Sequence, residues 1–514
     1  MLKILNDFMA TLFKVLHCLI CGSHQEQKNE IWRCWMWHGI KMRNLICSST
    51  AASIMTCLLV YARFQVNAQS LETVRIQVEP QSVVSRISPD FVGLGYESSA
   101  VAQSNYFSAE NATLIQLYRN LNPHGLIRIG GCASDNTQYV PDGTPVARDF
   151  RQVSIINHKD LVNLGEFARA TGWKVMWGLN LGHGTKVEAV KEAAAVDAAL
   201  GSQLQSFQVG NEVEGLPNVK HDYAAYHTLY LDYKDGIRAV LPNAPFSGPD
   251  SVGHWDFITN FVSNEADDMK LLTQHYYCSD AHDPKASIEK MLTHDNRFET
   301  RLKALEQLCR DNGIRGYRIN EVNSFSSGGK PGVSDTFASA LWVLDYMFML
   351  ASCGCDGVNM ETDINHLAFV SHYSPIVHDT VMNCSARPEY YGMLAFAMAG
   401  KGDLLKLNLE KGDINLSAYA TKDDRGFLWF TVVNKDFSRD AAVEVVLPET
   451  YKAAASFRLK APSMESKNQV TFAGTEVSAN GKWKPKSPDK VTVDGGAARL
   501  IVPHASAVVL RLSQ

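Results

Sequence analysis

Eight short apolar runs, each closing on polar residues or a glycine, recur through the middle of this chain of 514 residues. The runs are FVGLGYE (91–97), LIRIGG (126–131), VMWGLN (175–180), SFQVGNE (206–212), PFSGPD (245–250), LLTQHYY (271–277), GYRINE (316–321) and GVNMET (357–362). Helix-like segments separate many of them, at 159–171, 186–200, 223–240, 298–312 and 336–351. Strands that alternate with helices favour a parallel sheet with crossover helices. Eight such units predict a closed (β/α)8 barrel, the TIM barrel, which is an α/β fold.

The chain after Gly402 has a different pattern, in which strand-like pieces follow one another with turn residues between them. The pieces are INLSAYAT, GFLWFTVVN, AAVEVVLP, ASFRLKAP, QVTFAG, KVTVDG and ARLIVPHASAVVLRL. Such a series is typical of a β-sandwich. Upstream of the barrel, the segment 69–90 contains VRIQVEP and is expected to join that sandwich as an extra strand. We therefore predict a catalytic barrel over 91–402 and a β-sandwich domain over 403–514.

The first 68 residues differ from the rest of the chain. Lys41-Met42-Arg43 precedes a mostly apolar stretch at 45–62, and the small residues of Val66-Asn67-Ala68 follow. A basic start, a hydrophobic middle and a small-residue cleavage site predict a signal peptide. We expect residues 1–68 to be a leader with a start near Met42, cleavage after Ala68, and a secreted or periplasmic product. The alternative is a signal anchor that stays in the membrane.

Charge and cysteine content narrow the possible partners. A formal net charge of −5 gives no basic excess that would favour nucleic acid or an anionic membrane. The part after Ala68 has neither paired CxxC motifs nor His-x-x-x-His spacing, so we predict no metal site. Its cysteines are even in number, which permits disulfides without fixing their pairing. They are Cys132, Cys278, Cys309, Cys353, Cys355 and Cys384.

Two glutamates stand at the predicted strand ends in matching contexts, VGNE for Glu212 and RINE for Glu321. The carboxyl ends of barrel strands carry the active site, and strands four and seven face one another across the mouth. Glycosidic bond cleavage needs one carboxylic acid to protonate the leaving oxygen and one carboxylate on the other side. This arrangement resembles that of retaining barrel glycosidases, which have the acid/base on strand four and the nucleophile on strand seven. The resemblance implies that Glu212 is the acid/base and Glu321 the nucleophile. Glu214, expected to be exposed on the following loop, is the alternative acid.

Four further residues are predicted to support this pair. His275 and Tyr277 share one face of strand six because side chains alternate along a strand. Tyr277 is expected to donate a hydrogen bond to the nucleophile, and Arg128 to favour its anionic form. Asn211 is expected to bind the sugar 2-hydroxyl. The alternatives are core aromatic packing, a structural ion pair and a turn-forming asparagine.

A longer motif follows Glu321. The run SDTFASALWVLDYM resembles the segment after the nucleophile in heparanase and the related bacterial β-glucuronidases of glycoside hydrolase family 79. LIRIGG, VGNE, QHYY and RPEYYGMLAFAMAG are similar as well. The likeness spans about residues 73–514, including the sandwich.

The resemblance implies that the substrate carries a uronic acid. In such enzymes its carboxylate meets backbone amides of a glycine loop, here Gly328 and Gly329, and a tyrosine after strand eight, here Tyr373. Glu97 in GYESS matches the family's acidic residue that hydrogen-bonds ring hydroxyls. One departure weighs against an acidic sugar, because Ser326-Ser327 stands where family members commonly have a tyrosine. The acidic segment METDINH at 360–366 weighs the same way.

The sequence therefore predicts an exported retaining β-glucuronidase that cleaves terminal β-linked glucuronic acid through a covalent glycosyl-enzyme intermediate. A β-xylosidase or β-glucosidase of the same barrel clan is the first alternative, and a non-catalytic carbohydrate-binding protein is the second. The expected partner is a carbohydrate, either a glucuronide or a glycan that carries uronic acid. No cofactor, nucleic acid or stable membrane partner is expected after signal cleavage.

Overall fold

The computed structural model describes the chain downstream of the predicted leader. The described residues are 71–103, 105–144, 152–362, 371–378, 383–447, 451 and 453–513. Residues Ser70–Gln514 form one compact unit. The leader over 1–68, its start near Met42 and its cleavage site lie outside the described residues and stay predictions. Among the residues described, no helix is both long and apolar enough to cross a bilayer.

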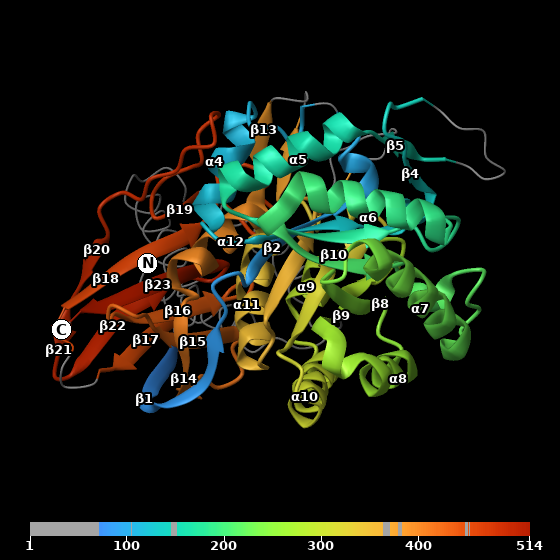
Figure 1. The fold of residues 1–514 in the computed structure, drawn as a ribbon. Helices are drawn as coiled ribbons and strands as arrows, with labels where there is room; N and C mark the ends of the chain where they lie inside the picture. Colours follow the sequence, from blue (N-terminus) through green and yellow to red (C-terminus); the bar gives the residue numbers. More distant parts are fainter. Residues whose placement is uncertain are drawn as a thin grey trace, which may run out of the picture. The chain divides into compact units, whose positions relative to one another are not determined.

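A closed barrel of parallel strands occupies the first part of this unit (Figure 1). The eight strands pair in the cyclic order β10-β11-β2-β3-β6-β7-β8-β9. Each of the eight predicted strands is found, and their bounds are β2 (Val92–Glu97), β3 (Leu126–Gly130), β6 (Lys174–Leu179), β7 (Leu204–Val209), β8 (Phe246–Ser251), β9 (Met269–Asp280), β10 (Tyr317–Ser326) and β11 (Gly357–Glu361). Because all these strands are parallel, their carboxyl ends meet at one mouth.

Helices surround the barrel. Their bounds are α4 (Ala112–Leu121), α5 (His158–Thr171), α6 (Lys186–Leu200), α7 (Tyr223–Val240), α8 (Trp255–Glu265), α9 (Ile288–Leu292), α10 (Asn296–Asp311), α11 (Phe337–Ser352) and α12 (Pro388–Ala399). Two begin with capping boxes, Asn157 with Asp160 for α5 and Thr185 with Glu188 for α6. Each box satisfies amide groups that a helix start would otherwise leave unpaired. The five helices predicted from the sequence are confirmed.

The strand-rich part forms an 11-stranded sheet in the order β19-β18-β23-β16-β15-β14-β1-β17-β22-β21, with β20 paired to β18. Its strands are β1 (Leu71–Ile87), β14 (Gly402–Glu410), β15 (Leu416–Lys422), β16 (Leu428–Asn434), β17 (Asp440–Val446), β18 (Ala453–Lys460), β19 (Thr471–Phe472), β20 (Asp489–Val491), β21 (Val493–Asp494), β22 (Ala497–Val502) and β23 (Ser506–Ser513). The predicted upstream strand is β1, which lies between β14 and β17. Alternate residues of β1, including Val74 and Ile76, enter a core shared with β16 and β22.

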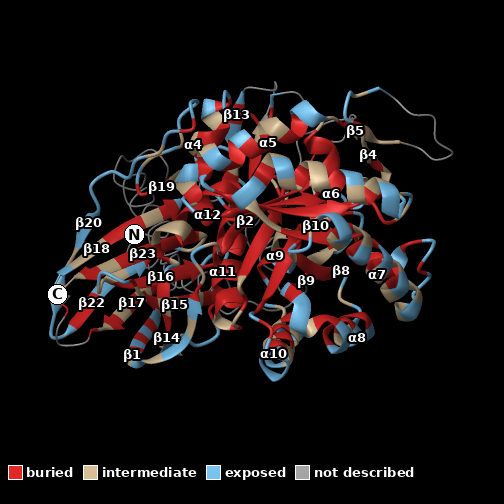
Figure 2. Ribbon diagram, viewed as in Figure 1, coloured by how far each residue is buried: buried red, intermediate tan, exposed pale blue. Residues whose placement is uncertain are grey.

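Helix α11 connects the barrel to the sheet. All but the last of its residues are buried (Figure 2), which agrees with a helix packed on more than one side. Asp345 on α11 accepts hydrogen bonds from Lys435 Nζ at 2.5 Å and from Tyr419 OH at 2.7 Å. The fold class predicted from the sequence, a (β/α)8 barrel with a C-terminal β-sandwich domain, is confirmed. The six cysteines within the described residues are free thiols.

Candidate active site

The two predicted carboxylates meet at the mouth of the barrel. Glu321 lies within β10, and Glu212 follows β7 with a left-handed backbone (φ 45°, ψ 51°). The Glu212 amide donates to the Asp250 carbonyl at 2.9 Å, which fixes this turn against β8. One oxygen of each carboxylate and one ring nitrogen of His275 lie within 4.8 Å of one another. Glu212 and Glu321 therefore face a common space.

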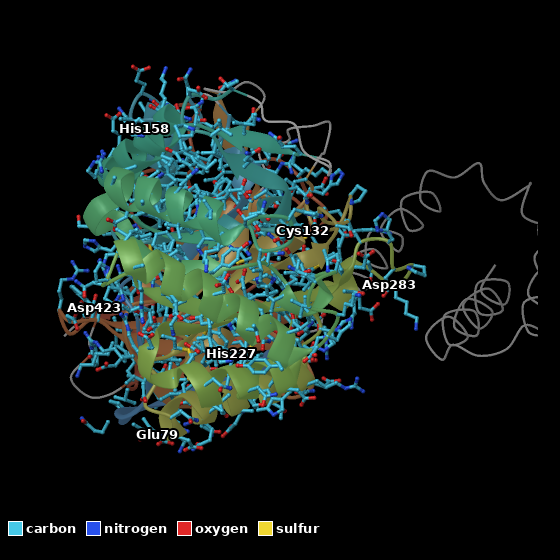
Figure 3. The ribbon with its side chains drawn as sticks, turned by 45° about the vertical axis from the view of Figure 1, so that its right-hand side comes forward. Glu79, Cys132, His158, His227, Asp283 and Asp423 are labelled. Carbon is cyan, nitrogen blue, oxygen red and sulfur yellow. The ribbon has the colours of Figure 1, made fainter. Side chains whose placement is uncertain are left out.

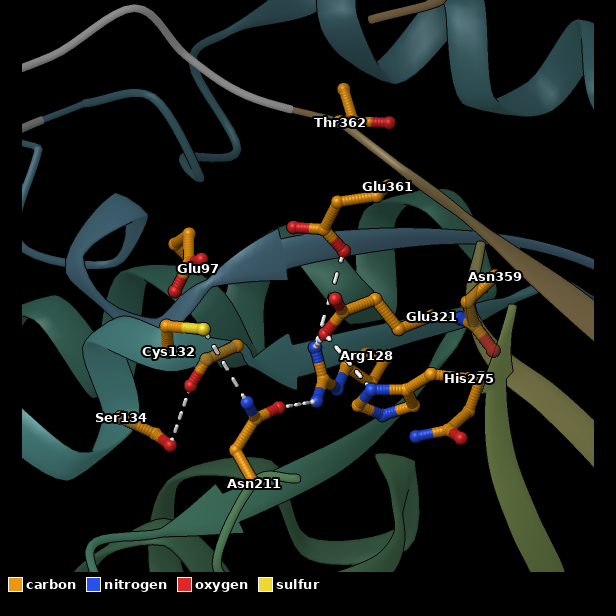
Figure 4. Close-up of polar contacts among 12 residues, drawn as sticks. Glu97, Arg128, Cys132, Ser134, Asn211, His275, Glu321, Asn359, Glu361 and Thr362 are labelled. Carbon is orange, nitrogen blue, oxygen red and sulfur yellow. Dashed lines mark hydrogen bonds and ion pairs between the residues drawn. The ribbon is translucent and has the colours of Figure 1, made fainter. Parts of the chain in front are cut away.

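Glu321 is held by two donors, one on each oxygen. Arg128 Nη1 donates to Oε2 at 2.7 Å (Figure 4). Tyr277 OH donates to Oε1 at 3.0 Å. Arg128 is fully buried, and the Glu321 side chain is 9% exposed. These contacts place Arg128 and Tyr277 where the sequence predicted them, and they fix the orientation of the carboxylate.

Asp250 is a central residue of the site that the sequence analysis did not select. It lies on β8, is 1% exposed and has a positive φ of 63°. Arg128 Nη2 donates to its Oδ2 at 2.8 Å, and Gln208 Nε2 donates to its Oδ1 at 2.7 Å. His275 Nε2 contacts Oδ1 at 3.0 Å. Burial opposes ionisation, but the charges of Arg128 and His275 hold the pKa of Asp250 well below its usual range.

His275 connects the acidic groups. Its Nε2 faces Asp250, while its Nδ1 lies 3.2 Å from Glu212 Oε1 and 3.6 Å from Glu321 Oε2. Burial lowers the pKa of His275, but the neighbouring carboxylates outweigh burial and raise it well above the usual value. We therefore treat the ring as an imidazolium that donates from both nitrogens.

The imidazolium also determines the charge on Glu212. Burial raises the pKa of Glu212. The hydrogen bond and charge of His275 lower it by a larger amount, so the pKa lies below its usual value. The Glu212 side chain remains 33% exposed. Glu212 is thus solvent-accessible and paired with His275, whose charge favours its ionised form.

Glu214 does not lie where the sequence predicted. Instead of being exposed on the loop, it is fully buried, and its Oε1 accepts a hydrogen bond from Ser251 Oγ at the end of β8. The reason is the turn at Glu212, because the short helix η4 (Val213–Gly215) directs Glu214 against β8. Glu214 therefore ties this turn to β8 and is not directed into the site.

Asn211 and Glu97 line the opposite side of the site (Figure 4). Asn211 Oδ1 accepts from Arg128 Nη2 at 2.5 Å, and its Nδ2 points to Cys132 Sγ at 3.7 Å. Glu97 Oε2 accepts from the Ala133 amide at 2.6 Å. This contact requires Gly131, because a Cβ there would lie 2.2 Å from that carboxylate oxygen. Glu97 thus has a capping role at this turn beside the sugar-binding role predicted for it.

Cys132 is a second residue that the sequence analysis did not select. It is exposed, and Figure 3 shows it among the polar side chains of this region, with Asp283 further toward the periphery. The residue is exposed as a whole, yet its thiol is partly buried. That burial, together with the carboxylates of Glu97, Glu321 and Glu212, raises the pKa of the thiol well above the usual value.

The glycine loop and the tyrosine predicted to bind a uronate lie together. Gly328 and Gly329 have positive φ angles of 80° and 84°. The His372 amide donates to the Gly328 carbonyl at 2.6 Å. The ring of Tyr373 is stacked near that of Tyr277, with centroids 6.3 Å apart. The loop is therefore connected through Tyr373 and Tyr277 to Glu321. Residues 363–366 of the acidic segment lie outside the described residues.

Glu361 at the end of β11 also adjoins the site, with Oε2 4.0 Å from Arg128 Nη1. Among the described residues, one group could hold a metal ion, namely Glu212, His275 and Glu321. In this group Arg128 already neutralises Glu321, and a protonated His275 cannot act as a ligand. These three side chains are therefore better suited to transferring protons than to binding a metal ion.

A family profile described as the Glycosyl hydrolase family 79 C-terminal beta domain matches residues 395–509. A β-glucuronidase from Aspergillus niger is 22% identical over 489 residues, which cover 82% of this chain and 88% of that protein. The solved structure of a 4-O-α-L-rhamnosyl-β-D-glucuronidase from Fusarium oxysporum 12S matches with a TM-score of 0.68 at 18% identity, over 86% of this chain and 99% of that one. A family 51 α-L-arabinofuranosidase from Bifidobacterium longum matches with a TM-score of 0.64 at 14% identity, over 86% and 100%.

The barrel, the facing carboxylates and these relatives define the class of protein, which is a glycoside hydrolase. More particularly, the resemblance to glycoside hydrolase family 79 that the sequence indicates is confirmed.

Proposed function

We propose that this glycoside hydrolase is a retaining β-glucuronidase, with Glu321 as nucleophile and Glu212 as acid/base. The observation that carries the proposal is the approach of one oxygen from each carboxylate to within 4.8 Å of the other. Retaining glycosidases have carboxyl groups about 5–5.5 Å apart, whereas inverting ones leave about 6.5–9.5 Å for a water molecule. Oxygens this close agree with the retaining arrangement, in which a carboxylate attacks the sugar directly.

In the first step Glu321 attacks the anomeric carbon as the bond to the leaving oxygen breaks, and Glu212 gives its proton to that oxygen. In the second step Glu212 takes a proton from water, which attacks the same carbon and releases Glu321. Tyr277 and Arg128 keep the nucleophile oriented through their hydrogen bonds to its two oxygens. The His275 imidazolium stabilises the Glu212 carboxylate that the first step produces.

The proposed substrate is a terminal β-linked glucuronide. The Aspergillus niger and Fusarium oxysporum relatives are named for action on glucuronides. The glycine loop is hydrogen-bonded to the His372 amide, and the adjacent Tyr373 ring lies near Tyr277, the tyrosine that binds Glu321. In this proposal the sugar carboxylate binds the Gly328 amide and Tyr373. Backbone amides exposed in a turn form a concave site that suits an anion. Glu97 and Asn211 contact ring hydroxyls.

A panel of p-nitrophenyl β-glycosides tests the substrate. We expect release from the β-glucuronide at a rate at least tenfold above that from the β-glucoside or β-xyloside. Release from a neutral sugar alone would replace the proposal with a β-glucosidase or β-xylosidase. No release from any member, with retained glycan binding, would indicate a carbohydrate-binding protein. As a control, Glu306→Gln changes an acidic residue on α10 that pairs with Arg310, away from the site. This variant should release p-nitrophenol at the same rate as the wild-type protein.

We also propose that the protein is exported and that its leader is removed after Ala68. Support comes from the basic residues at 41–43, the apolar stretch at 45–62 and the small residues before the predicted cleavage site. Amino-terminal sequencing of the protein from its native host should begin at Gln69. A product that retains residues 45–62 would indicate a signal anchor instead.

A further inference from the structure

The glycine loop has a strained backbone. Immediately after β10, Ser327, Gly328 and Gly329 adopt successive positive φ angles of 57°, 80° and 84°. Glycine tolerates this region readily, but a serine in it costs free energy that surrounding contacts must offset. Ser327 therefore needs contacts from neighbouring groups to keep this conformation.

Asp280 supplies one such set of contacts. It is the last residue of β9, in register with Ser326 on β10. Its Oδ2 accepts hydrogen bonds from Ser326 Oγ at 3.0 Å and from Ser327 Oγ at 2.6 Å. Its Oδ1 accepts from the His282 amide at 2.7 Å, so the carboxylate is fixed against the turn that follows its own strand. One carboxylate thus binds both serines that precede the glycines.

The other side of the loop is held by contacts of its backbone and of the Lys330 side chain. Within the loop, the Gly329 amide donates to the Ser326 carbonyl at 3.3 Å. The Gly328 carbonyl accepts from the His372 amide, and the Lys330 amide donates to Ser334 Oγ at 2.9 Å. Lys330 Nζ donates to the Ala281 carbonyl at 2.9 Å, next to Asp280. The loop is therefore clamped between the end of β9 and the segment that carries Tyr373.

We propose that Asp280 is a positioning residue that holds the Gly328 amide in the geometry for a sugar carboxylate. The inference rests on the proposed β-glucuronidase function and adds to it the group that sets the preference for acidic sugars. It also gives a role to Ser326 and Ser327, which stand where family members commonly have a tyrosine. Their two hydroxyls are the donors that Asp280 needs.

The charge of Asp280 agrees with this role. Hydrogen bonds from Ser327, the His282 amide and ring, and Ser326 hold the pKa of Asp280 below its usual range. Oδ2, the oxygen that both serines reach, therefore carries charge and accepts two bonds at once. An asparagine at this position keeps one carbonyl oxygen but replaces the other with a donor, and an alanine removes every contact.

The test compares p-nitrophenyl β-glucuronide with its methyl ester, which has the same ring but no charge at the sugar carboxyl. For Asp280→Ala we expect kcat/KM on the glucuronide to fall at least tenfold, mainly through KM. The value for the ester should change less than twofold, and Asp280→Asn should be intermediate. Asp283→Asn is the matched control, because Asp283 accepts from Ser279 Oγ and the Lys285 amide on the same rim without touching the glycine loop.

Equal losses on both substrates, or no loss on the glucuronide, would overturn the inference. If Asp280→Ala does not fold, the double variant Ser326→Ala and Ser327→Ala removes the same two hydrogen bonds and should give the same selective rise in KM. A wild-type protein that releases nothing from the glucuronide would instead refute the proposed function. The two failures are therefore distinguishable.

Discussion

His275→Gln is the substitution that most directly tests the electrostatics of the site. The imidazolium lies 3.2 Å from Glu212 Oε1, and its charge lowers the pKa of Glu212. Glutamine is polar and neutral, so the variant loses the charge without introducing an apolar group. Since a positive charge near a carboxyl favours the ionised form, its loss must raise the pKa of Glu212.

The magnitude follows from the distance. At 3.2 Å, two unit charges interact with about 5 kcal/mol at an effective dielectric constant of about 20 and with about 1.3 kcal/mol in water. One pKa unit corresponds to about 1.4 kcal/mol. The Glu212 side chain is 33% exposed, so solvent screens the pair and the lower figure is the safer guide. We expect the pKa of Glu212 to rise by about one unit or more.

The assay is the pH dependence of kcat/KM, which reports ionisations of the free enzyme. Phenyl β-glucuronide suits it, because a poor leaving group needs the proton from Glu212. The general acid must be protonated, so the alkaline limb should move to higher pH in His275→Gln. His294→Gln, at an exposed histidine paired with Glu299, should leave the alkaline limb in place. An alkaline limb that stays in place or moves to lower pH would refute this reasoning.

Three further predictions concern single residues. In Glu212→Ala, azide should restore turnover and yield a β-glycosyl azide, and failure of rescue would reject Glu212 as the acid/base. Burial raises the pKa of Glu192 to about 7 despite a hydrogen bond from Trp177. The folded state then keeps a proton that the unfolded chain loses above pH 4.5, so stability should fall between pH 4.5 and 7 by at most about 3 kcal/mol. In denaturant titrations at several pH values, Glu192→Gln should reduce this pH-dependent loss of unfolding free energy. A loss as large as that of the wild-type protein would contradict the prediction. Iodoacetamide should inactivate the enzyme slowly at neutral pH and faster as pH rises, because the pKa of Cys132 is raised. Cys132→Ser should be resistant, and equal inactivation of this variant would exclude the thiol at the site.

The barrel was predictable because its strands are buried on both faces and read as continuous apolar runs. The helix α12 was not predicted as a helix. Nearly all its residues are buried, so its sequence lacks the polar stripe that marks a surface helix. The bounds of β9 and β10 extend past the predicted ends at 277 and 321, since both strands continue into the rim that holds Asp280.

The site was predictable where position along a strand decides it, as for Glu212 and Glu321. Asp250 also stood at a predicted strand end, but its importance comes from contacts with Arg128 and His275 on other strands. Such contacts depend on the left-handed backbone at Asp250, which a sequence does not display. The orientation of Glu214 likewise depends on the left-handed turn at Glu212.

The central claim is that Glu321 forms a covalent bond to the sugar. The direct measurement is inactivation with a 2-deoxy-2-fluoro-β-glucuronyl fluoride, followed by peptide mass spectrometry. The fluorine slows hydrolysis of the intermediate, so one equivalent of sugar should accumulate on the peptide that contains Glu321. A label on any other residue, or full turnover of phenyl β-glucuronide with product of inverted configuration, would contradict the account.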